Sequence, residues 1–151
     1  MAAGNFVFYG SFFEYLAKGL IDLDGHTLVA MLMGTGYTPD DDSHTVVADI
    51  SANEVSSGTY PDYARVTLTT VTVTRSGMVT TFDSDPVDFG ATVDILAAYI
   101  VLFDDTPTSP ADPLIGYADL NNSGASVASV DGPFIVSPHA TNGWGTFGPP
   151  A

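Results

Sequence analysis

The segment ARVTLTTVTVTR, residues 64–75, constrains the fold more than any other part of the sequence. Valine and leucine largely alternate with threonine along it, which is the period of a β-strand with one apolar and one polar face. The alternation slips once near Thr69 and Thr70, where a β-bulge would restore it. Ser76 and Gly77 then favour a tight turn into MVTTFDS. The sequence therefore predicts an antiparallel β-hairpin.

Other apolar runs of strand length are separated by Gly, Pro, Asn and Ser. TLVAMLM at 27–33 and ILAAYIVLFDD at 95–105 are apolar almost throughout, as expected of central strands with both faces covered. A helix is the alternative prediction for residues 95–105. LIGYADL at 114–120 alternates, and GPFIVSP at 132–138 indicates a shorter strand.

One short helix is predicted over SFFEYLAKGL, residues 11–20, with Ser11 as its N-cap, Glu14 at the capping-box position and Gly19 as its end. The chain of 151 residues fits one domain. We expect a mainly β fold, an antiparallel β-sandwich of jelly-roll type with this single N-terminal helix. The predicted organisation is an arm at 1–10, the sandwich domain at 11–138 and a Gly/Pro-rich tail at 139–151.

The charge narrows the class of partner. The sequence has 18 acidic residues and only three cations, Lys18, Arg65 and Arg75, for a formal net charge of −15. Such a surface repels nucleic-acid phosphates and anionic membranes, so we expect neither as a partner. No run reaches the roughly 18 apolar residues of a membrane-spanning helix. The N-terminal stretch lacks the basic leader of a secretory signal, which predicts synthesis in the cytoplasm.

Residues that support catalysis are scattered. The sequence has no cysteine, and its three histidines, His26, His44 and His139, lie in three separate loops. No nucleophile-elbow motif and no phosphate-binding glycine motif accompanies them. The two glutamates, Glu14 and Glu54, lie on the predicted helix and in a long loop, which does not favour a paired-carboxylate site. We expect a non-enzymatic protein without a cofactor.

Clustered aspartates raise the question of calcium, because oxygen ligands suit a hard cation. DLDGH carries Asp22 and Asp24, and DDDSH carries Asp40, Asp41 and Asp42. Neither cluster matches a complete calcium-binding loop. Aspartates between apolar runs are typical of turns, so we expect no metal and retain these five residues as the only candidates.

The long segment at 34–62 is rich in turn formers and acids, and loops of this length often carry function or contact a partner. Within it, SANEVSSGTYPDYARV combines Asn53, Gly58 and Pro61 with Glu54 and Arg65. We predict that Glu54 and Arg65 form an ion pair that closes the loop onto the strand that follows.

The order of several segments is similar to that of a known family. GLIDLDGHTLVAMLMGTGYTPDDDSH, SANEVSSGTYPDYARVTL and AAYIVLFDDTPTSPADPLIGYADL resemble small structural proteins encoded in the virion gene clusters of tailed bacteriophages. The shared pattern is a short helix, an IDLD turn, a strand before a YTPD loop, an ANEVSG-type segment and an LIGY strand. The resemblance covers about residues 12–120 and leaves out the C-terminal tail.

The resemblance implies a virion component without catalytic residues. The expected role is a capsid decoration, or cement, protein on the capsid surface that binds the lattice of the major capsid protein and itself as a trimer or dimer. A tail, neck or head-fibre component with a receptor- or carbohydrate-binding role is the alternative. Aromatic residues of the arm, the 34–62 loop and the tail are the predicted partner contacts: Phe6, Phe8, Tyr9, Tyr37, Tyr60, Trp144 and Phe147.

Overall fold

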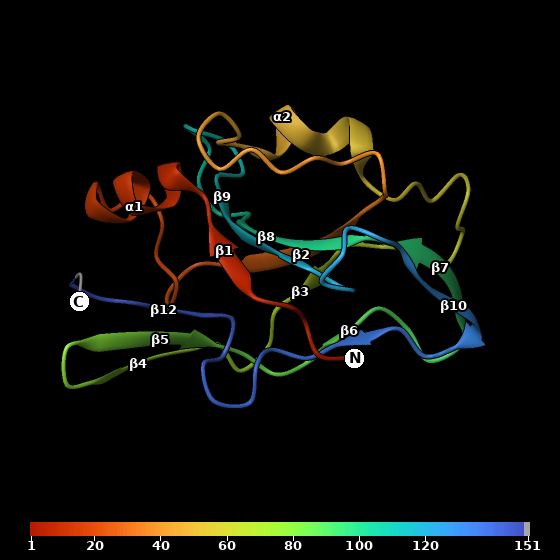
Figure 1. The fold of residues 1–151 in the computed structure, drawn as a ribbon. Coiled ribbons are helices and arrows are strands. Elements are labelled where there is room, and N and C mark those ends of the chain that lie inside the picture. Colours follow the sequence, from red (N-terminus) through yellow and green to blue (C-terminus); the bar gives the residue numbers. More distant parts are fainter. Residues whose placement is uncertain (150–151) are drawn as a thin grey trace.

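The computed structural model describes residues 1–149 and is mainly β, with antiparallel sheets and two short α-helices (Figure 1). The elements are β1 Phe6–Phe8, α1 Gly10–Ala17, β2 Leu28–Met33, α2 Val47–Ile50, the 3₁₀ turn η1 Ser51–Asn53, β3 Val66–Thr67, β4 Thr72–Ser76, β5 Val79–Asp83, β6 Val87–Asp88, β7 Val93–Ala97, β8 Tyr99–Asp104, β9 Leu114–Asp119, β10 Val127–Gly132, β11 Ile135–Val136 and β12 Gly145–Phe147.

A five-stranded sheet in the order β1-β9-β8-β2-β3 forms the centre of the molecule. β2 and β8 pair antiparallel from Leu28 opposite Asp104 to Met33 opposite Tyr99. All six residues of β2 are buried, which confirms the prediction of a central strand with both faces covered. Smaller sheets pair β10 with β7, β11 with β6, and β12 with β5 and β4.

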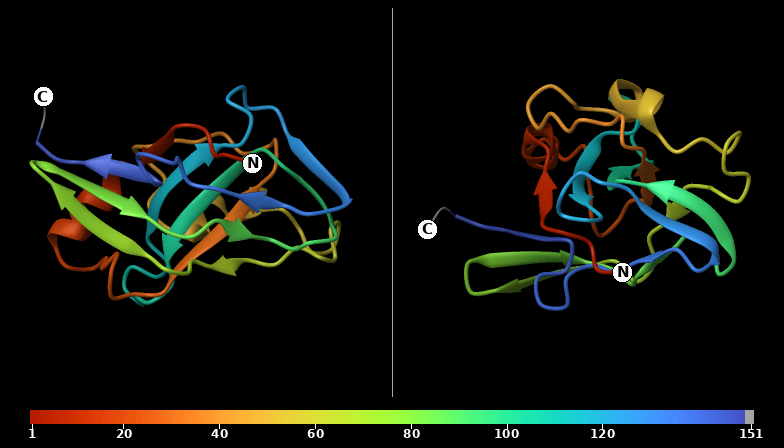
Figure 2. Two further views of the ribbon diagram at one scale, coloured as in Figure 1. Left: turned by 90° about the horizontal axis from the view of Figure 1, so that it is seen from below. Right: turned by 45° about the vertical axis from the view of Figure 1, so that its right-hand side comes forward.

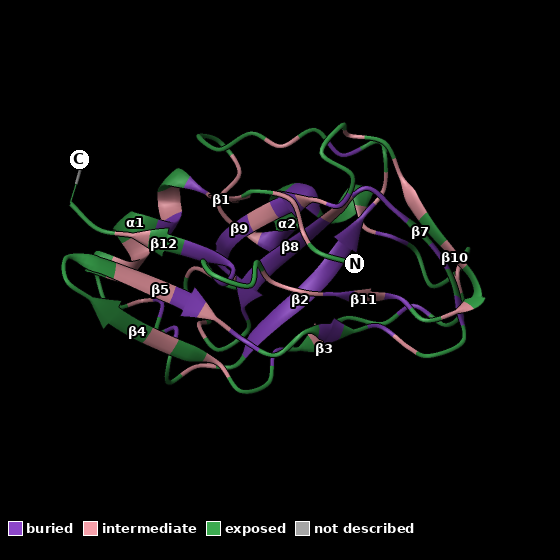
Figure 3. Cartoon of the chain, turned by 60° about the horizontal axis from the view of Figure 1, so that its bottom comes forward, coloured by how far each residue is buried: buried purple, intermediate pink, exposed green. Residues whose placement is uncertain are grey.

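The two faces of the central sheet are covered differently (Figures 2 and 3). On one face, here called the strand-covered face, residues such as Ala30 and Ile100 pack with Phe82 of β5 and with Phe134 and Trp144, which immediately precede β11 and β12. On the other, the loop-covered face, Met31 and Val101 pack with Tyr37 and α2. The loop that contains α2 lies above the sheet in Figure 1.

The predicted strand at 64–75 is two strands. Thr70 has a φ of 51°, a left-handed conformation that interrupts an extended chain. β3 therefore joins the central sheet and β4 joins the three-stranded sheet. The hairpin after it is confirmed, with Ser76 opposite Val79. Residues 95–105 also divide, into the end of β7 and all of β8, so a helix there is wrong.

The predicted helix exists as α1, and Gly19 follows it with a φ of 70°. Ser11 is not its N-cap: the helix starts one residue earlier, after Tyr9, and the Ser11 hydroxyl is buried without a hydrogen-bond partner. Glu14 pairs with Lys18 one turn on and forms no capping box. At eight residues, α1 is the longest helix described, and no helix in residues 1–149 could span a bilayer.

The second helix, α2, was not predicted. The Asp49 carboxylate accepts hydrogen bonds from the backbone N–H groups of Thr45 (2.9 Å) and Val46 (3.1 Å), which satisfies donors that a helix start leaves free. In TVVAD, residues 45–49, the helix signal is an aspartate three and four residues after the two backbone N–H donors. It lies in a segment whose composition is typical of a loop.

Neither terminus is a detached segment within residues 1–149. β1 pairs with β9 from Phe6 opposite Ala118 to Phe8 opposite Gly116, and the Ala3 N–H donates to the Ser137 carbonyl at 2.9 Å. The expected arm at 1–10 is thus part of the central sheet. The expected tail at 139–151 supplies β12, which pairs with β5; its last two residues lie outside the described range.

Candidate functional site

The predicted ion pair forms and has a third member. The Arg65 guanidinium donates from Nε and Nη2 to the two carboxylate oxygens of Glu54, at 2.8 and 2.7 Å. The Tyr63 hydroxyl donates to Glu54 at 2.8 Å and accepts from the Leu32 N–H at 3.0 Å. This group ties the loop to β2. Burial raises the pKa of Tyr63, so it stays a donor at neutral pH.

Four tyrosines gather between the loop and the loop-covered face. The hydroxyls of Tyr9 and Tyr37 form a hydrogen bond in the interior, and the Tyr117 hydroxyl donates to Asp41 at 2.7 Å. The Tyr99 ring packs edge-on against Tyr37. Burial raises the pKa of Tyr37 to about 12. These hydroxyl contacts fasten the 34–53 loop together with isolated backbone hydrogen bonds, such as those from the Val47 N–H to the Asp112 carbonyl and from the Leu114 N–H to the Thr45 carbonyl.

Two of the three histidines, His44 and His139, accept hydrogen bonds within their own turns. Nδ1 of His44 accepts from the Asp40 N–H at 3.2 Å, and Nδ1 of His139 accepts from the N–H groups of Thr141 and Asn142, both at 3.2 Å. In the neutral form of each of these two rings, the N–H proton therefore lies on Nε2. His44 and His139 thus have a local structural role in their turns.

His26 has a further partner that the sequence did not reveal. Its Nδ1 lies 2.7 Å from Oδ2 of Asp104, a fully buried carboxylate. At that distance Nδ1–H donates to the carboxylate, so the 3.3 Å approach of the Asp22 N–H to the same nitrogen is a longer, secondary contact. Asp104 also accepts from the Thr106 N–H at 3.1 Å. The pair connects the turn before β2 to the end of β8.

The two aspartate clusters form the same turn twice. In both D-x-D-x-H segments the first aspartate accepts from backbone N–H groups two and three residues on, Asp22 at 3.1 and 2.9 Å and Asp40 at 3.1 Å to each. The hydrogen bond from the Ser43 hydroxyl lowers the pKa of Asp40 further. Asp24, Asp41 and Asp42 are exposed. Within residues 1–149 no three acidic or histidine side chains gather as metal ligands would.

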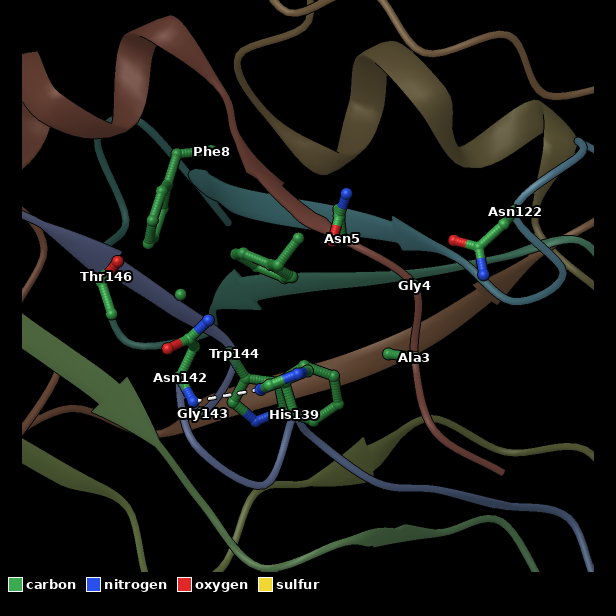
Figure 4. Close-up of a pocket in the computed structure, with 12 residues that line it drawn as sticks. Ala3, Gly4, Asn5, Phe8, Asn122, His139, Asn142, Gly143, Trp144 and Thr146 are labelled. Atoms are coloured by element: carbon green, nitrogen blue, oxygen red, sulfur yellow. Dashed lines mark hydrogen bonds between the residues drawn. The ribbon is translucent and has the colours of Figure 1, made fainter.

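A polar groove of about 460 Å³ lies between the start of β1 and the turn that precedes β12 (Figure 4). Side chains that are able to form hydrogen bonds with a ligand line it, namely Asn5, Asn122, His139, Asn142 and Thr146. Phe6 and Phe8 contribute partly exposed aromatic surface, and the buried Trp144 ring lies behind them, 6.0 Å from Phe6 between ring centroids. Amide groups beside aromatic rings suit a neutral, hydroxyl-rich ligand.

Glycine is needed on both sides of this groove. Gly143 has a φ of 59°, and a Cβ there would lie 2.5 Å from the Phe82 carbonyl oxygen. A Cβ on Gly4 would lie 2.6 Å from the Asp119 carbonyl oxygen. Because real side chains never approach backbone so closely, these two positions fix the groove walls.

The predicted partner-contact residues divide into two groups. Tyr9, Tyr37 and Trp144 are buried, so they cannot contact a partner and that prediction is corrected; the Trp144 indole instead donates to the Ser84 hydroxyl at 2.8 Å. The others are partly exposed: Phe6, Phe8, Tyr60 and Phe147. Phe6 and Phe8 line the polar groove, whereas Tyr60 and Phe147 do not.

Six large apolar residues are exposed within residues 1–149, none of them among the predicted contacts, and two of the six lie on the paired strands β7 and β10. Val130 on β10 is 77% exposed and Leu96 on β7 is 40% exposed. The two strands pair, with Ala128 opposite Leu96. Asp131 has a φ of 48° and the register shifts between Ser129 and Gly132, and such a bulge re-aims the side chains beside it. Alternation in VDILA would place Leu96 on an outer face, but nothing in SVDG predicts the bulge.

The four tyrosines lie on the loop-covered face, whereas Tyr63 of the Glu54 group and the groove aromatics Phe6 and Phe8 pack on the strand-covered face. The groove joins segments that are more than 130 residues apart, Ala3 to Phe8 and His139 to Thr146. Comparison of the chain with protein-family models, with curated proteins and with solved structures found no match.

Proposed function

We propose that this chain is a non-enzymatic structural protein of a bacteriophage virion, made in the bacterial cytoplasm and bound to the capsid surface as a decoration protein. Its proposed fold is the β-sandwich of jelly-roll type expected from the sequence. The observation that carries the proposal is the doubly covered central sheet, with β2 and β8 buried on both faces. A rigid domain of this kind resists mechanical load. The resemblance to virion proteins of tailed bacteriophages suggests that this load acts on a capsid.

The local chemistry supports a binding role. His44 and His139 accept hydrogen bonds within their own turns, and His26 is held by a buried carboxylate. Arg65 and Lys18 are both paired with glutamates. The remaining surface is acidic and favours a neutral or basic partner such as a shell lattice, where many modest contacts add through avidity.

The exposed apolar pair Leu96 and Val130 is the contact that we assign to the lattice. Serine at both positions removes apolar contact area at the surface while the buried face of β7, Val93, Ile95 and Ala97, stays intact. We expect L96S/V130S to fold normally and to occupy particles poorly. M78S is the matched control, because Met78 is 72% exposed on the separate β4–β5 turn.

The test has two readouts. Densitometry of purified particles against the major shell protein should find the protein in hundreds of copies, and a handful would instead place it in the tail or neck. Particles that lack it, incubated with purified protein, should recover it from the unmodified chain and from M78S but not from L96S/V130S. Absence from purified particles would refute the proposal. Equal recovery of all three proteins would remove Leu96 and Val130 from it.

A receptor- or carbohydrate-binding role is the second candidate, and the polar groove favours it. The amides of Asn5, Asn122 and Asn142 line the same groove as the Phe8 ring, a combination that suits sugar hydroxyls and sugar faces. Titration of the isolated protein with neutral oligosaccharides, followed by amide NMR shifts, tests it. Shifts confined to the groove and abolished by N142A would favour this role over the first.

A further inference from the structure

The acidic residues avoid two segments of the chain. All 18 lie outside residues 63–82 and 132–151, and the first of these segments also holds Arg65 and Arg75. The rest of the sequence carries the whole negative charge with one cation, Lys18. Any surface built from the two acid-free segments therefore differs in charge from the remainder of the molecule.

The fold brings the two segments together in one sheet. β4 and β5 come from the first and β12 from the second, in the order β12-β5-β4; we call these three strands the threonine sheet. Thr81 lies opposite both Thr74 and Thr146 in register, so three threonines form a row across one face. Asp83, the last residue of β5, is the only acid in these strands. The sheet extends from the body of the molecule in Figures 1 and 2.

β4 is the free edge of this sheet, since it pairs with β5 alone. Alternate residues of an antiparallel edge strand direct their N–H and C=O groups away from the sheet. Natural edges are protected by charges, proline or bulges. β4, with the sequence TVTRS, carries one charge, Arg75, and no proline or register shift. Threonine and valine favour extended strands, so the edge accepts another strand.

We propose that β4 pairs antiparallel with β4 of a second copy across a twofold axis, joining two threonine sheets into one of six strands. Charge selects the occupant. Two copies with a net charge of −15 each repel over most of their surfaces. β4 itself carries no acid, and the acids nearest to it are Asp83 opposite Thr72 and the pair Asp22 and Asp24, which line a pocket with Val73. Pairing centred on Val73 or Thr74 sets Arg75 opposite Val71 or Val73, so the two arginines do not face each other.

This pairing has an unusual dependence on salt. Its attraction comes from backbone hydrogen bonds and threonine contacts, and its opposition comes from the summed negative charge of two copies. Added salt screens that repulsion over a Debye length of about 10 Å at 0.1 M. The dimer should therefore strengthen as ionic strength rises, whereas association through exposed ion pairs would weaken. The inference concerns the assembly unit and does not depend on the virion role.

Sedimentation of the full chain tests the proposal. We expect a concentration-dependent dimer of the 15.7 kDa chain, more abundant at higher salt, and a monomer for T72E/T74E, which places like charges on the paired edge. T35E/T59E is the matched control, because both threonines are exposed outside the threonine sheet, and it should dimerise like the unmodified protein. A circular dichroism spectrum checks that each variant is folded.

Cross-linking tests the edge directly, because the chain has no cysteine. Among single variants T72C, T74C and S76C, mild oxidation should link two copies through at least one, while T59C should stay unlinked. A chain that is monomeric at every concentration and salt would overturn the proposal. So would a dimer that survives T72E/T74E, a trimer, or cross-linking that is no faster on β4 than at residue 59.

Discussion

The two faces of the central sheet are covered by different means. On the strand-covered face the contacts are aliphatic and aromatic, with Phe82 and Phe134 fully buried. On the loop-covered face an irregular segment lies on Met31 and Val101, and its tyrosines form hydrogen bonds as well as apolar contacts. Strands satisfy their backbone groups with each other, so they bring only side-chain surface to a neighbour. A loop lacks a ladder and needs polar anchors.

The largest effect should come from the strand-covered face. F82A removes a fully buried ring of β5 from the core on this face, and the cavity should lower the free energy of unfolding by roughly 3–5 kcal/mol. Urea denaturation measures it. M78A, at an exposed position of the same hairpin, should change the value by less than about 0.5 kcal/mol. A cost for F82A near that of M78A would show that this face is loosely packed.

The loop-covered face should respond to single hydroxyl groups. Y9F leaves the buried Tyr37 hydroxyl without its main partner, which should lower the free energy of unfolding by about 1–3 kcal/mol. Y9F/Y37F should cost less than the sum of Y9F and Y37F, because both ends of the bond are removed together. Strict additivity in this double-mutant cycle would mean that the hydrogen bond between the two hydroxyls does not stabilise the fold.

The Glu54 group separates loop attachment from global stability. E54Q keeps the shape but weakens the bonds from Arg65 and Tyr63, and because Arg65 is partly exposed the global cost should be about 1 kcal/mol. Hydrogen exchange should accelerate locally, at Val55, whose N–H bonds to the Leu32 carbonyl. D62N, an exposed acid in the same loop, is the control. Uniform acceleration across β8 would contradict a local role.

The smallest expected effect is a change in the stability of the fold at acidic pH. Hydrogen bonds from the Thr45 backbone N–H lower the pKa of Asp49 below its ordinary value of 3.8. A carboxyl with a lowered folded-state pKa stabilises the fold above its unfolded pKa, and this contribution disappears as pH falls through the folded value. D49N should thus be less stable than the unmodified chain at pH 7, with the difference vanishing towards pH 2. Thermal unfolding across this range measures it, and a constant difference would exclude the linkage.

Sequence reasoning succeeded where the pattern is local. The apolar run in β2, the Ser76–Gly77 hairpin and the Glu54–Arg65 pair all follow from residues near one another in the chain. It failed where contacts between segments far apart in the sequence determine which strands form and which sheet they join. β1 has only three residues and acquires its structure from β9. Nothing about Thr70 marks it as the residue that sends β3 and β4 into different sheets.

The two aspartate–histidine turns could have been predicted from the sequence but were not. The repeated D-x-D-x-H spacing of residues 22–26 and 40–44 places a histidine four residues after an aspartate, and both turns close with a hydrogen bond from the histidine backbone N–H to the aspartate carbonyl. The burial of Tyr9 and Trp144 was not readable, because an aromatic beside glycine can lie inside or outside. Their neighbours in space, Tyr37 and Ser84, are 28 and 60 residues away.

The pairing of β1 with β9, and of β5 with β12, sets an order of events during synthesis. Phe6–Phe8 leaves the ribosome early but has no partner until residues 116–118 follow, and β5 waits for residues 145–147. A nascent chain therefore carries unpaired edges and exposed aromatic rings through most of translation, when such surfaces invite aggregation. The dense negative charge of the intervening segments keeps neighbouring nascent chains apart until the last strand arrives.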